Sequence, residues 1–169
     1  MLRTTVRVIS ATILLVGGFF AVAPGTASAH PDCEYYNGTV CYQEEQLDPG
    51  DHFQCFGHPG DFKHNTDVIK VDWQNDGSWD ECFGVGANRK IYHTWPQVTT
   101  WLVMPNGGLA DNTYSAFPYQ GQYRTVSVQV ARSGGGVTYY CSSVKNSAWG
   151  AWGICSNPPK GTRTPGGGS

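Results

Sequence analysis

The sequence predicts an all-β protein, organised as a small β-sheet domain linked by disulfides. Two observations favour this class over a helical one. Apolar and polar residues alternate with a period of two at 125–130 (TVSVQV), as in a half-buried strand. Glycine, proline, asparagine and aspartate interrupt the chain so often that apolar residues never keep helical spacing beyond a few positions. Six cysteines in a short chain supply the predicted cross-links.

The first 29 residues have the pattern of a secretory signal peptide. Arg3 and Arg7 precede a largely apolar run at 8–22, and the small-residue sequence Ala-Ser-Ala at 27–29 provides a cleavage site before His30. No stop-transfer charges follow the apolar run, so a membrane anchor is not expected. We therefore expect a secreted, extracellular protein whose mature chain begins at His30.

The cysteines all follow this cleavage site, which predicts three disulfides in an exported chain. Cys141 and Cys155 bracket one segment of the chain and are expected to pair. The remaining cysteines are then expected to pair with their nearest neighbours in the sequence, Cys33 with Cys41 and Cys55 with Cys82.

Runs rich in β-branched and aromatic residues at 68–73, 90–95 and 125–130 predict strands. Turn residues at 75–78 (NDGS) and 132–136 (RSGGG) separate such runs and predict hairpin connections.

The mature chain divides by composition into an acidic, cysteine-containing segment (30–80), a central part (81–156) and a tail (157–169) whose residues predict disorder. Residues 30–81 hold twelve of the thirteen acidic residues and only Lys63 and Lys70 as basic ones. Such a face is either simply solvated or meets a basic protein. No dense basic stripe is present, so nucleic acid is not expected as a partner.

The central part contains two similar strings. IYHTWPQ at 91–97, with Trp101 and Asn-Gly-Gly-Leu at 106–109, is echoed by VTYYCS at 137–142 and WGAWG at 149–153. Aligning the strings gives a period within the range of roughly 20–50 residues that indicates repeat architectures.

These strings resemble the blade repeats of PLL-type bacterial β-propeller lectins, which carry a "lyHtWQ" strand, a W-x-x-W segment and a closing LGG. The resemblance implies two blade-like repeats over 81–156 and binding of sugars, often fucosylated, in clefts lined by aromatic side chains. The implied carbohydrate- or partner-binding residues are Tyr92, His93, Trp95, Trp101, Tyr139, Tyr140, Trp149 and Trp152.

Two blades cannot close a propeller ring, so their strand edges need a cover. Either the acidic segment supplies it, through a strand such as 68–73, or a partner does. In size and style the chain is also similar to the small secreted adaptor proteins of actinobacterial umbrella-like toxin particles, which carry lectins.

Three patterns in the sequence resemble metal sites, but no metal or other cofactor is expected. His30 at the mature N-terminus could begin a copper brace, but no second ligand is specified. A loop at 52–64 contains three histidines and Cys55 at spacings that suit zinc, although a disulfide better explains the cysteine. Residues 72–80 resemble a calcium loop, yet Phe83 stands where a bidentate glutamate is required.

The sequence lacks the hydrolase signatures G-x-S-x-G and H-E-x-x-H, so we do not expect an enzyme. The leading hypothesis is a secreted, non-catalytic binding protein, an adaptor or accessory subunit of an extracellular assembly that docks lectin-like or repeat-containing proteins. A self-oligomerising lectin that binds glycans is the first alternative. A peptidase inhibitor that presents the loop at 56–63 is the second.

Overall fold

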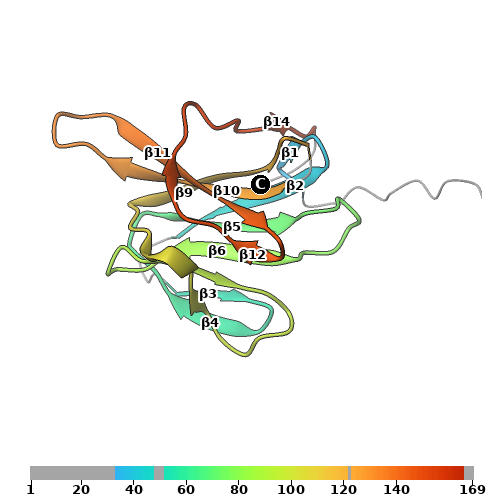
Figure 1. Cartoon of the computed structure of the whole chain (residues 1–169). Coiled ribbons are helices and arrows are strands. Elements are labelled where there is room, and N and C mark those ends of the chain that lie inside the picture. The colour runs from blue at the N-terminus through green and yellow to red at the C-terminus, as the bar shows by residue number, and fades with distance from the viewer. Residues whose placement is uncertain (1–32, 48–51, 122, 166–169) are drawn as a thin grey trace, which may run out of the picture.

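The structure, a computed structural model, describes residues 33–47, 52–121 and 123–165. Its elements are almost all strands, which confirms the all-β class (Figure 1). The predicted signal peptide and His30 lie outside the described residues.

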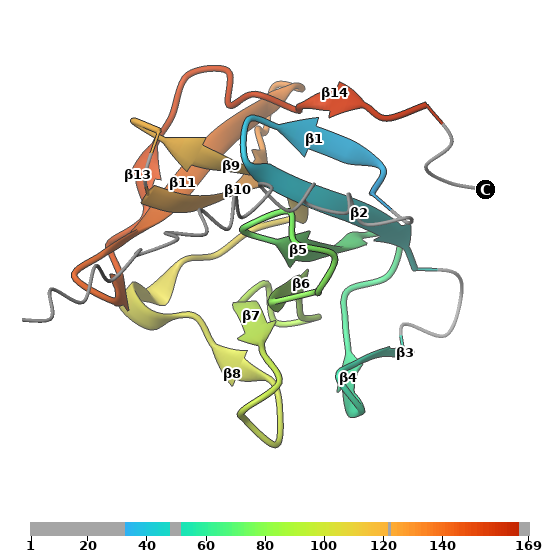
Figure 2. The same ribbon diagram turned by 90° about the vertical axis from the view of Figure 1, so that its right-hand side faces the viewer.

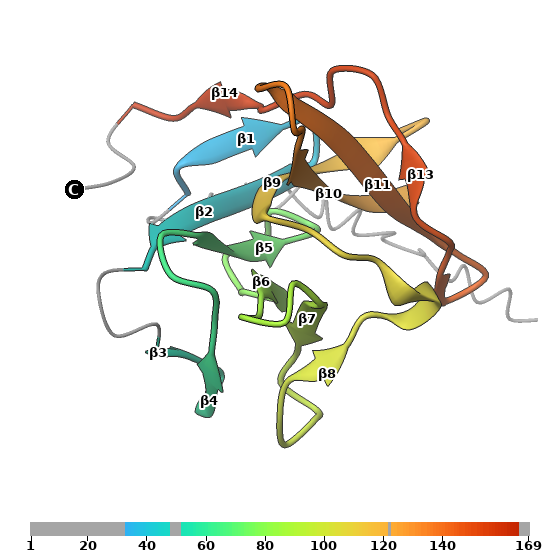
Figure 3. The same ribbon diagram turned by 90° about the vertical axis from the view of Figure 1, so that its left-hand side faces the viewer.

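The first sheet is antiparallel and has the strand order β14-β1-β2-β5-β6-β7-β8. Its strands are β1 (Tyr35–Asn37), β2 (Val40–Gln46), β5 (Asp67–Asp72), β6 (Glu81–Val85), β7 (Ile91–Thr94), β8 (Leu102–Val103) and β14 (Thr162–Arg163). The short 3-10 helix η1 (Pro105–Gly107) leads out of β8. Figures 2 and 3 show β14 beside β1, at the edge of the sheet far from β8.

The second sheet has the order β12-β11-β10-β9, and β13 also pairs with β11. Its strands are β9 (Asn112–Tyr119), β10 (Tyr123–Ala131), β11 (Val137–Lys145), β12 (Ala148–Trp149) and β13 (Gly153–Ile154). A separate hairpin consists of β3 (His52–Cys55) and β4 (His58–Asp61). The predicted strands at 68–73, 90–95 and 125–130 correspond to β5, β7 and β10, and the turn at 132–136 joins β10 to β11.

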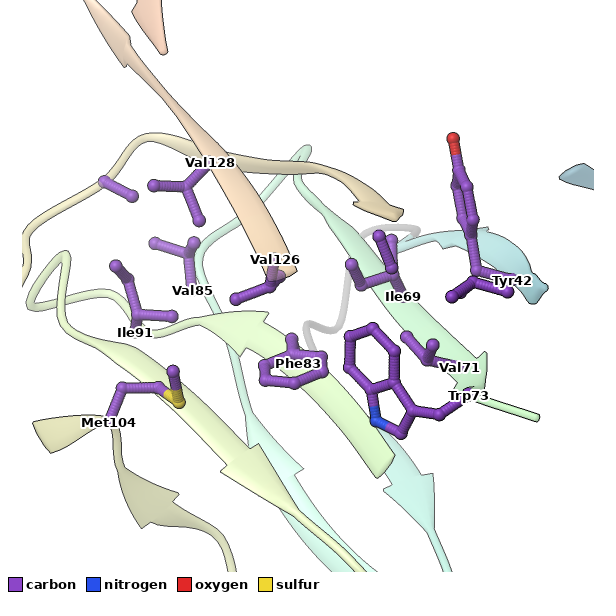
Figure 4. Packing of buried hydrophobic residues seen from close by; sticks show 13 residues of the cluster. Tyr42, Ile69, Val71, Trp73, Phe83, Val85, Ile91, Met104, Val126 and Val128 are labelled. Carbon is purple, nitrogen blue, oxygen red and sulfur yellow. The ribbon is translucent and has the colours of Figure 1, made fainter. Parts of the chain in front are cut away.

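The main core lies between the two sheets. Alternate residues of β6 and β7, such as Phe83 and Ile91, face Val126 and Val128 of β10 (Figure 4). Each such side chain is almost completely buried, which stabilises the fold by about 1.5–3 kcal/mol per residue. The two sheets therefore cover each other's apolar faces.

The opposite face of the first sheet carries a second, smaller core under the β3–β4 hairpin. Its buried members are Leu47, Cys55, Phe62, Val68, Cys82 and Trp101. The ring of Phe62 packs edge-on against Trp101, with centroids 4.6 Å apart. Gly84 of β6 makes this packing possible, because a Cβ there would lie 2.5 Å from the Phe62 ring.

The three expected disulfides are all formed: Cys33–Cys41, Cys55–Cys82 and Cys141–Cys155. Cys55–Cys82 ties the β3–β4 hairpin to β6, and Cys141–Cys155 ties the segment after β13 to β11. The Cys33–Cys41 bridge joins β2 to the residues that precede β1. Each peripheral element is thereby fixed to a central strand.

The compositional boundary between 30–80 and 81–156 does not separate two sheets. β5, from the acidic part, pairs with β6 from Ile69 to Val71, so both parts contribute to one sheet. β7 and β11, which contain the starts of the two similar strings, belong to opposite sheets of the sandwich. The propeller-like repeats are thus not confirmed, and the acidic segment supplies the neighbouring strand.

The tail differs from the expectation of disorder as far as residue 165. β14 pairs with β1, and the side chain of Arg163 contacts Glu34 at 3.1 Å. Lys160 forms an ion pair with Glu44 and lies 4.7 Å from the ring centroid of Tyr114. These polar and cation–π contacts hold a segment whose composition contains few apolar residues, which is why composition alone predicted no order.

We expect Gly84→Ala to destabilise the protein by about 1–3 kcal/mol, because the new methyl group would overlap the Phe62 ring in a closely packed core. Chemical unfolding monitored by tryptophan fluorescence would measure the loss. Gly134→Ala is the control, since a Cβ there meets no atom within 4 Å. Equal stability of the two variants would contradict the packing described for the hairpin.

Candidate functional site

A cleft of about 670 Å³ opens where the ends of the two sheets meet. This volume lies within the range of roughly 300–1,000 Å³ that is typical of small-molecule sites. The first sheet contributes the start of β6 and the end of β7 with the residues that follow it, and the second sheet contributes parts of β10, β11 and β12. The lining residues are Asp80, Glu81, His93, Trp95, Pro96, Gln97, Arg124, Val144, Ser147 and Trp149.

Glu81 is a buried carboxylate at the base of this cleft, 7% exposed. Its Oε1 atom accepts hydrogen bonds from Nδ1 of His93 at 2.7 Å and from Nε1 of Trp149 at 3.3 Å. Its Oε2 atom accepts one from Nε1 of Trp73 at 3.1 Å. A buried charge is costly unless it is hydrogen-bonded, and three donors satisfy this one.

His93 is oriented by the same carboxylate. A carboxylate only accepts hydrogen bonds, so Nδ1 of His93 must carry the proton that it donates to Glu81. The imidazole also stacks against Phe83, with centroids 6.1 Å apart, and lies 5.0 Å from the Trp95 ring. His93 lines the cleft, and because Nδ1 is bound to Glu81, Nε2 is the ring nitrogen left to meet a ligand there.

Two tryptophans form the apolar walls. Trp149 packs edge-on against Phe83 at 5.5 Å, and its indole N–H is bound to Glu81, so its ring is held in one position. Trp95 follows β7 directly, is partly exposed and lies outside both core clusters. One wall is therefore rigid, and the other is held mainly by its contact with His93.

Asp80 and Arg124 add charge on the side of the cleft near Trp73. Oδ2 of Asp80 accepts the backbone N–H of Trp73 at 2.7 Å. Burial raises the pKa of the Asp80 carboxyl above its ordinary value, and the positive charge of Arg124 partly offsets that effect. The Arg124 guanidinium also lies 5.7 Å from the Trp73 ring centroid, a cation–π distance.

The cleft unites three of the aromatic residues expected from the sequence: His93, Trp95 and Trp149. Tyr92 and Trp101 lie on the opposite face of the first sheet, in or against the small core, because side chains alternate across β7. Tyr140 and Trp152 pack against the main core and line a smaller cavity of about 220 Å³.

Tyr139 is also apart from the cleft. It pairs with Tyr114 of β9, with ring centroids 4.6 Å apart. Nothing in the sequence indicated Glu81, Gln97, Arg124 or Ser147 as site residues, and Asp80 appeared only as the last residue of the calcium-like pattern. The adjacent acids at 80 and 81, immediately before an apolar run, were the one visible signal among them.

Residues of the zinc-like and calcium-like patterns are bound to other groups in the structure. Cys55 is in a disulfide, while His52 bonds to Asp61 and His58 bonds to Thr94. Asp72 uses its carboxylate to accept three backbone N–H groups of the turn that follows, so these donors occupy the oxygens a calcium ion would need. No group of three or more potential metal ligands occurs in the described part of the chain.

The segment at 56–63 is a tight turn followed by β4, rather than an extended loop. Phe56 and Gly57 have φ values of 54° and 80°, which close the hairpin, and Phe62 is buried in the small core. The inhibitor alternative stays a prediction.

Comparison with known proteins adds no assignment: no family model, curated protein or solved structure matches the chain. Over the described ranges, no helix is long and apolar enough to cross a membrane. The three disulfides are typical of proteins that fold in an oxidising compartment.

We expect Glu81→Gln to lower the free energy of unfolding by about 1–3 kcal/mol. An amide has one oxygen and one NH₂ group, so it cannot accept from both ends, and one of the three donors would face another donor. Thermal or urea unfolding would measure the change. Glu45→Gln, which removes a half-exposed ion pair with Lys70, should cost less than about 1 kcal/mol. An unchanged Glu81→Gln protein would refute the network.

Proposed function

We propose that this is a secreted, non-catalytic binding protein whose cleft holds one saccharide unit of a glycan. The observation that carries the proposal is the pair of tryptophan walls beside a buried histidine whose ring edge lines the cleft. The disulfides and the sequence pattern of the first 29 residues support export.

A saccharide suits this combination of groups. The CH-rich face of a sugar ring packs well on an indole, and its hydroxyl groups both donate and accept hydrogen bonds. The cleft offers acceptors on His93 and Asp80 and donors on Gln97 and Arg124. A site of a few polar groups set between aromatic walls is the usual form of a specific small-ligand site.

The state of Glu81 supports binding rather than catalysis. Glycoside hydrolysis ordinarily needs two carboxyl groups, one of which donates a proton while the other attacks or activates water. Here three donors already occupy the Glu81 carboxylate, and one oxygen of Asp80 accepts the Trp73 backbone. The proposal also requires no ring of blades, because the two sheets bury each other's inner faces.

The proposal is tested by titrating labelled protein with a panel of methyl glycosides, including fucoside, galactoside and glucoside, and by following the indole N–H signals by NMR. We expect Trp95→Ala to bind roughly tenfold more weakly, because it removes one stacking wall, with little change in stability. Tyr119→Ala on β9, an exposed aromatic away from the cleft, is the control. If no saccharide perturbs the cleft, the proposal fails.

A second candidate, the adaptor function, is favoured by a different surface. β8 is the last strand of the first sheet on that side, and its side chains Leu102 and Val103 are 39% and 46% exposed, beside Leu109 at 53%. An open strand edge with apolar side chains can accept a strand from another protein. The partner would be another secreted, lectin-like or repeat-containing protein.

We expect an adaptor to retain a stoichiometric secreted partner from the producer's own culture supernatant. Val103→Lys should abolish that capture, since a charge on an edge strand opposes strand addition. Val137→Lys, on the other sheet and 37% exposed, should leave it intact. Capture that is equal for both variants would remove β8 as the docking edge.

A further inference from the structure

We propose that Nε2 of His93 accepts a hydrogen bond from a hydroxyl group of the ligand, and that the cleft therefore takes a neutral saccharide in preference to an acidic one. This inference rests on the proposed function and specifies the class of sugar. His93 is then the residue that selects the ligand.

The first step concerns the free nitrogen. His93 is only 6% exposed, yet it lines the cleft, and among the described residues no group hydrogen-bonds to its Nε2. A polar atom at such a position is costly unless it finds a partner. A ligand hydroxyl group can be that partner.

The second step concerns the direction of the hydrogen bond. The hydrogen bond to Glu81 places a proton on Nδ1, so an imidazole that carries one proton presents its lone pair at Nε2. The ring has little freedom to turn over, because it is bound to Glu81 and packed against Phe83 and Trp95. Nε2 therefore accepts, and the group that meets it must donate. A hydroxyl group does so, whereas a carboxylate or sulfate cannot.

The third step concerns charge around that nitrogen. The Glu81 carboxylate is bound to Nδ1 of the imidazole. Asp80, the residue before Glu81, lines the same cleft. The one cation among the described lining residues, Arg124, interacts with Asp80 and lies over the Trp73 ring. Its charge is thus partly offset, and an anionic substituent near His93 would face two carboxylates and a lone pair. Like charges brought together in one cleft repel.

The tautomer is tested without any ligand. NMR correlation of the histidine ring nitrogens with their carbon-bound protons distinguishes a protonated Nδ1 from a protonated Nε2. At neutral pH we expect His93 to carry its proton on Nδ1 and to show an unprotonated Nε2. A proton on Nε2, or on both nitrogens, would overturn the inference.

The specificity is tested with matched probes. Methyl galactoside and methyl glucoside are compared with methyl galacturonide and methyl glucuronide, which differ only by a carboxylate in place of the hydroxymethyl group. We expect the neutral sugar of each pair to bind at least roughly tenfold more tightly. Monodeoxy analogues of the better neutral sugar, titrated against the unchanged protein, should identify one hydroxyl whose removal weakens binding roughly three- to tenfold.

His93→Asn links that hydroxyl to the residue. The asparagine amide can still donate to Glu81 from the position of Nδ1, but it lacks the distal acceptor. The variant should bind the intact sugar roughly three- to tenfold more weakly and should no longer distinguish it from the deoxy analogue. His58→Asn is the control, because His58 bonds through Nδ1 to Thr94 outside the cleft. This variant should bind the intact sugar and the deoxy analogue with the same affinities as the unchanged protein.

The outcomes separate the two proposals. If saccharides bind in the cleft but the uronides bind equally or better, or if no deoxy analogue is weakened, the role of His93 is wrong and the carbohydrate function stands. If none of the probes perturbs the cleft, both fall. Should His93→Asn fail to fold, the deoxy series and the tautomer decide the question with the unchanged chain.

Discussion

The site depends on one buried carboxylate, that of Glu81. It accepts hydrogen bonds from Trp73 and His93 on the first sheet and from Trp149 on the second. A carboxylate buried without hydrogen-bond donors would destabilise the fold, so the burial of Glu81 depends on all three donors. The same bonds join the two sheets, hold one wall of the cleft and set which nitrogen of the histidine is free. The fold and the proposed ligand recognition thus share one constraint.

A small, glycine-rich chain reaches this rigidity by covering both faces of its first sheet. On one face the second sheet buries Phe83 and Ile91, and on the other the β3–β4 hairpin buries Phe62. Each disulfide fixes a peripheral segment to a central strand, which limits the freedom of the unfolded chain more than it adds contacts. Such a sandwich can hold a polar network at the end of its core without opening.

The strings that resemble propeller blades show what short sequence patterns can and cannot predict. The first string contains β7, which the sequence predicted as a strand, and three of the eight aromatic residues that the strings singled out meet in the cleft. The strings lie in opposite sheets, however, because strand partners are chosen by contacts between distant residues rather than by the strand's own sequence. The two strings were expected to repeat one structural unit, but they belong to different layers of the sandwich.

The sequence by itself determined the all-β class, the main strands and turns, and the disulfide pairs, because alternation and turn chemistry act locally and each cysteine pairs with its neighbour along the chain. Only the tertiary structure decided which polar groups share the cleft. Trp149 and Glu81 are 68 residues apart in the chain, and Arg124 comes from yet another strand. No local pattern encodes that meeting, since it arises when two sheets stack and bring their strand ends together.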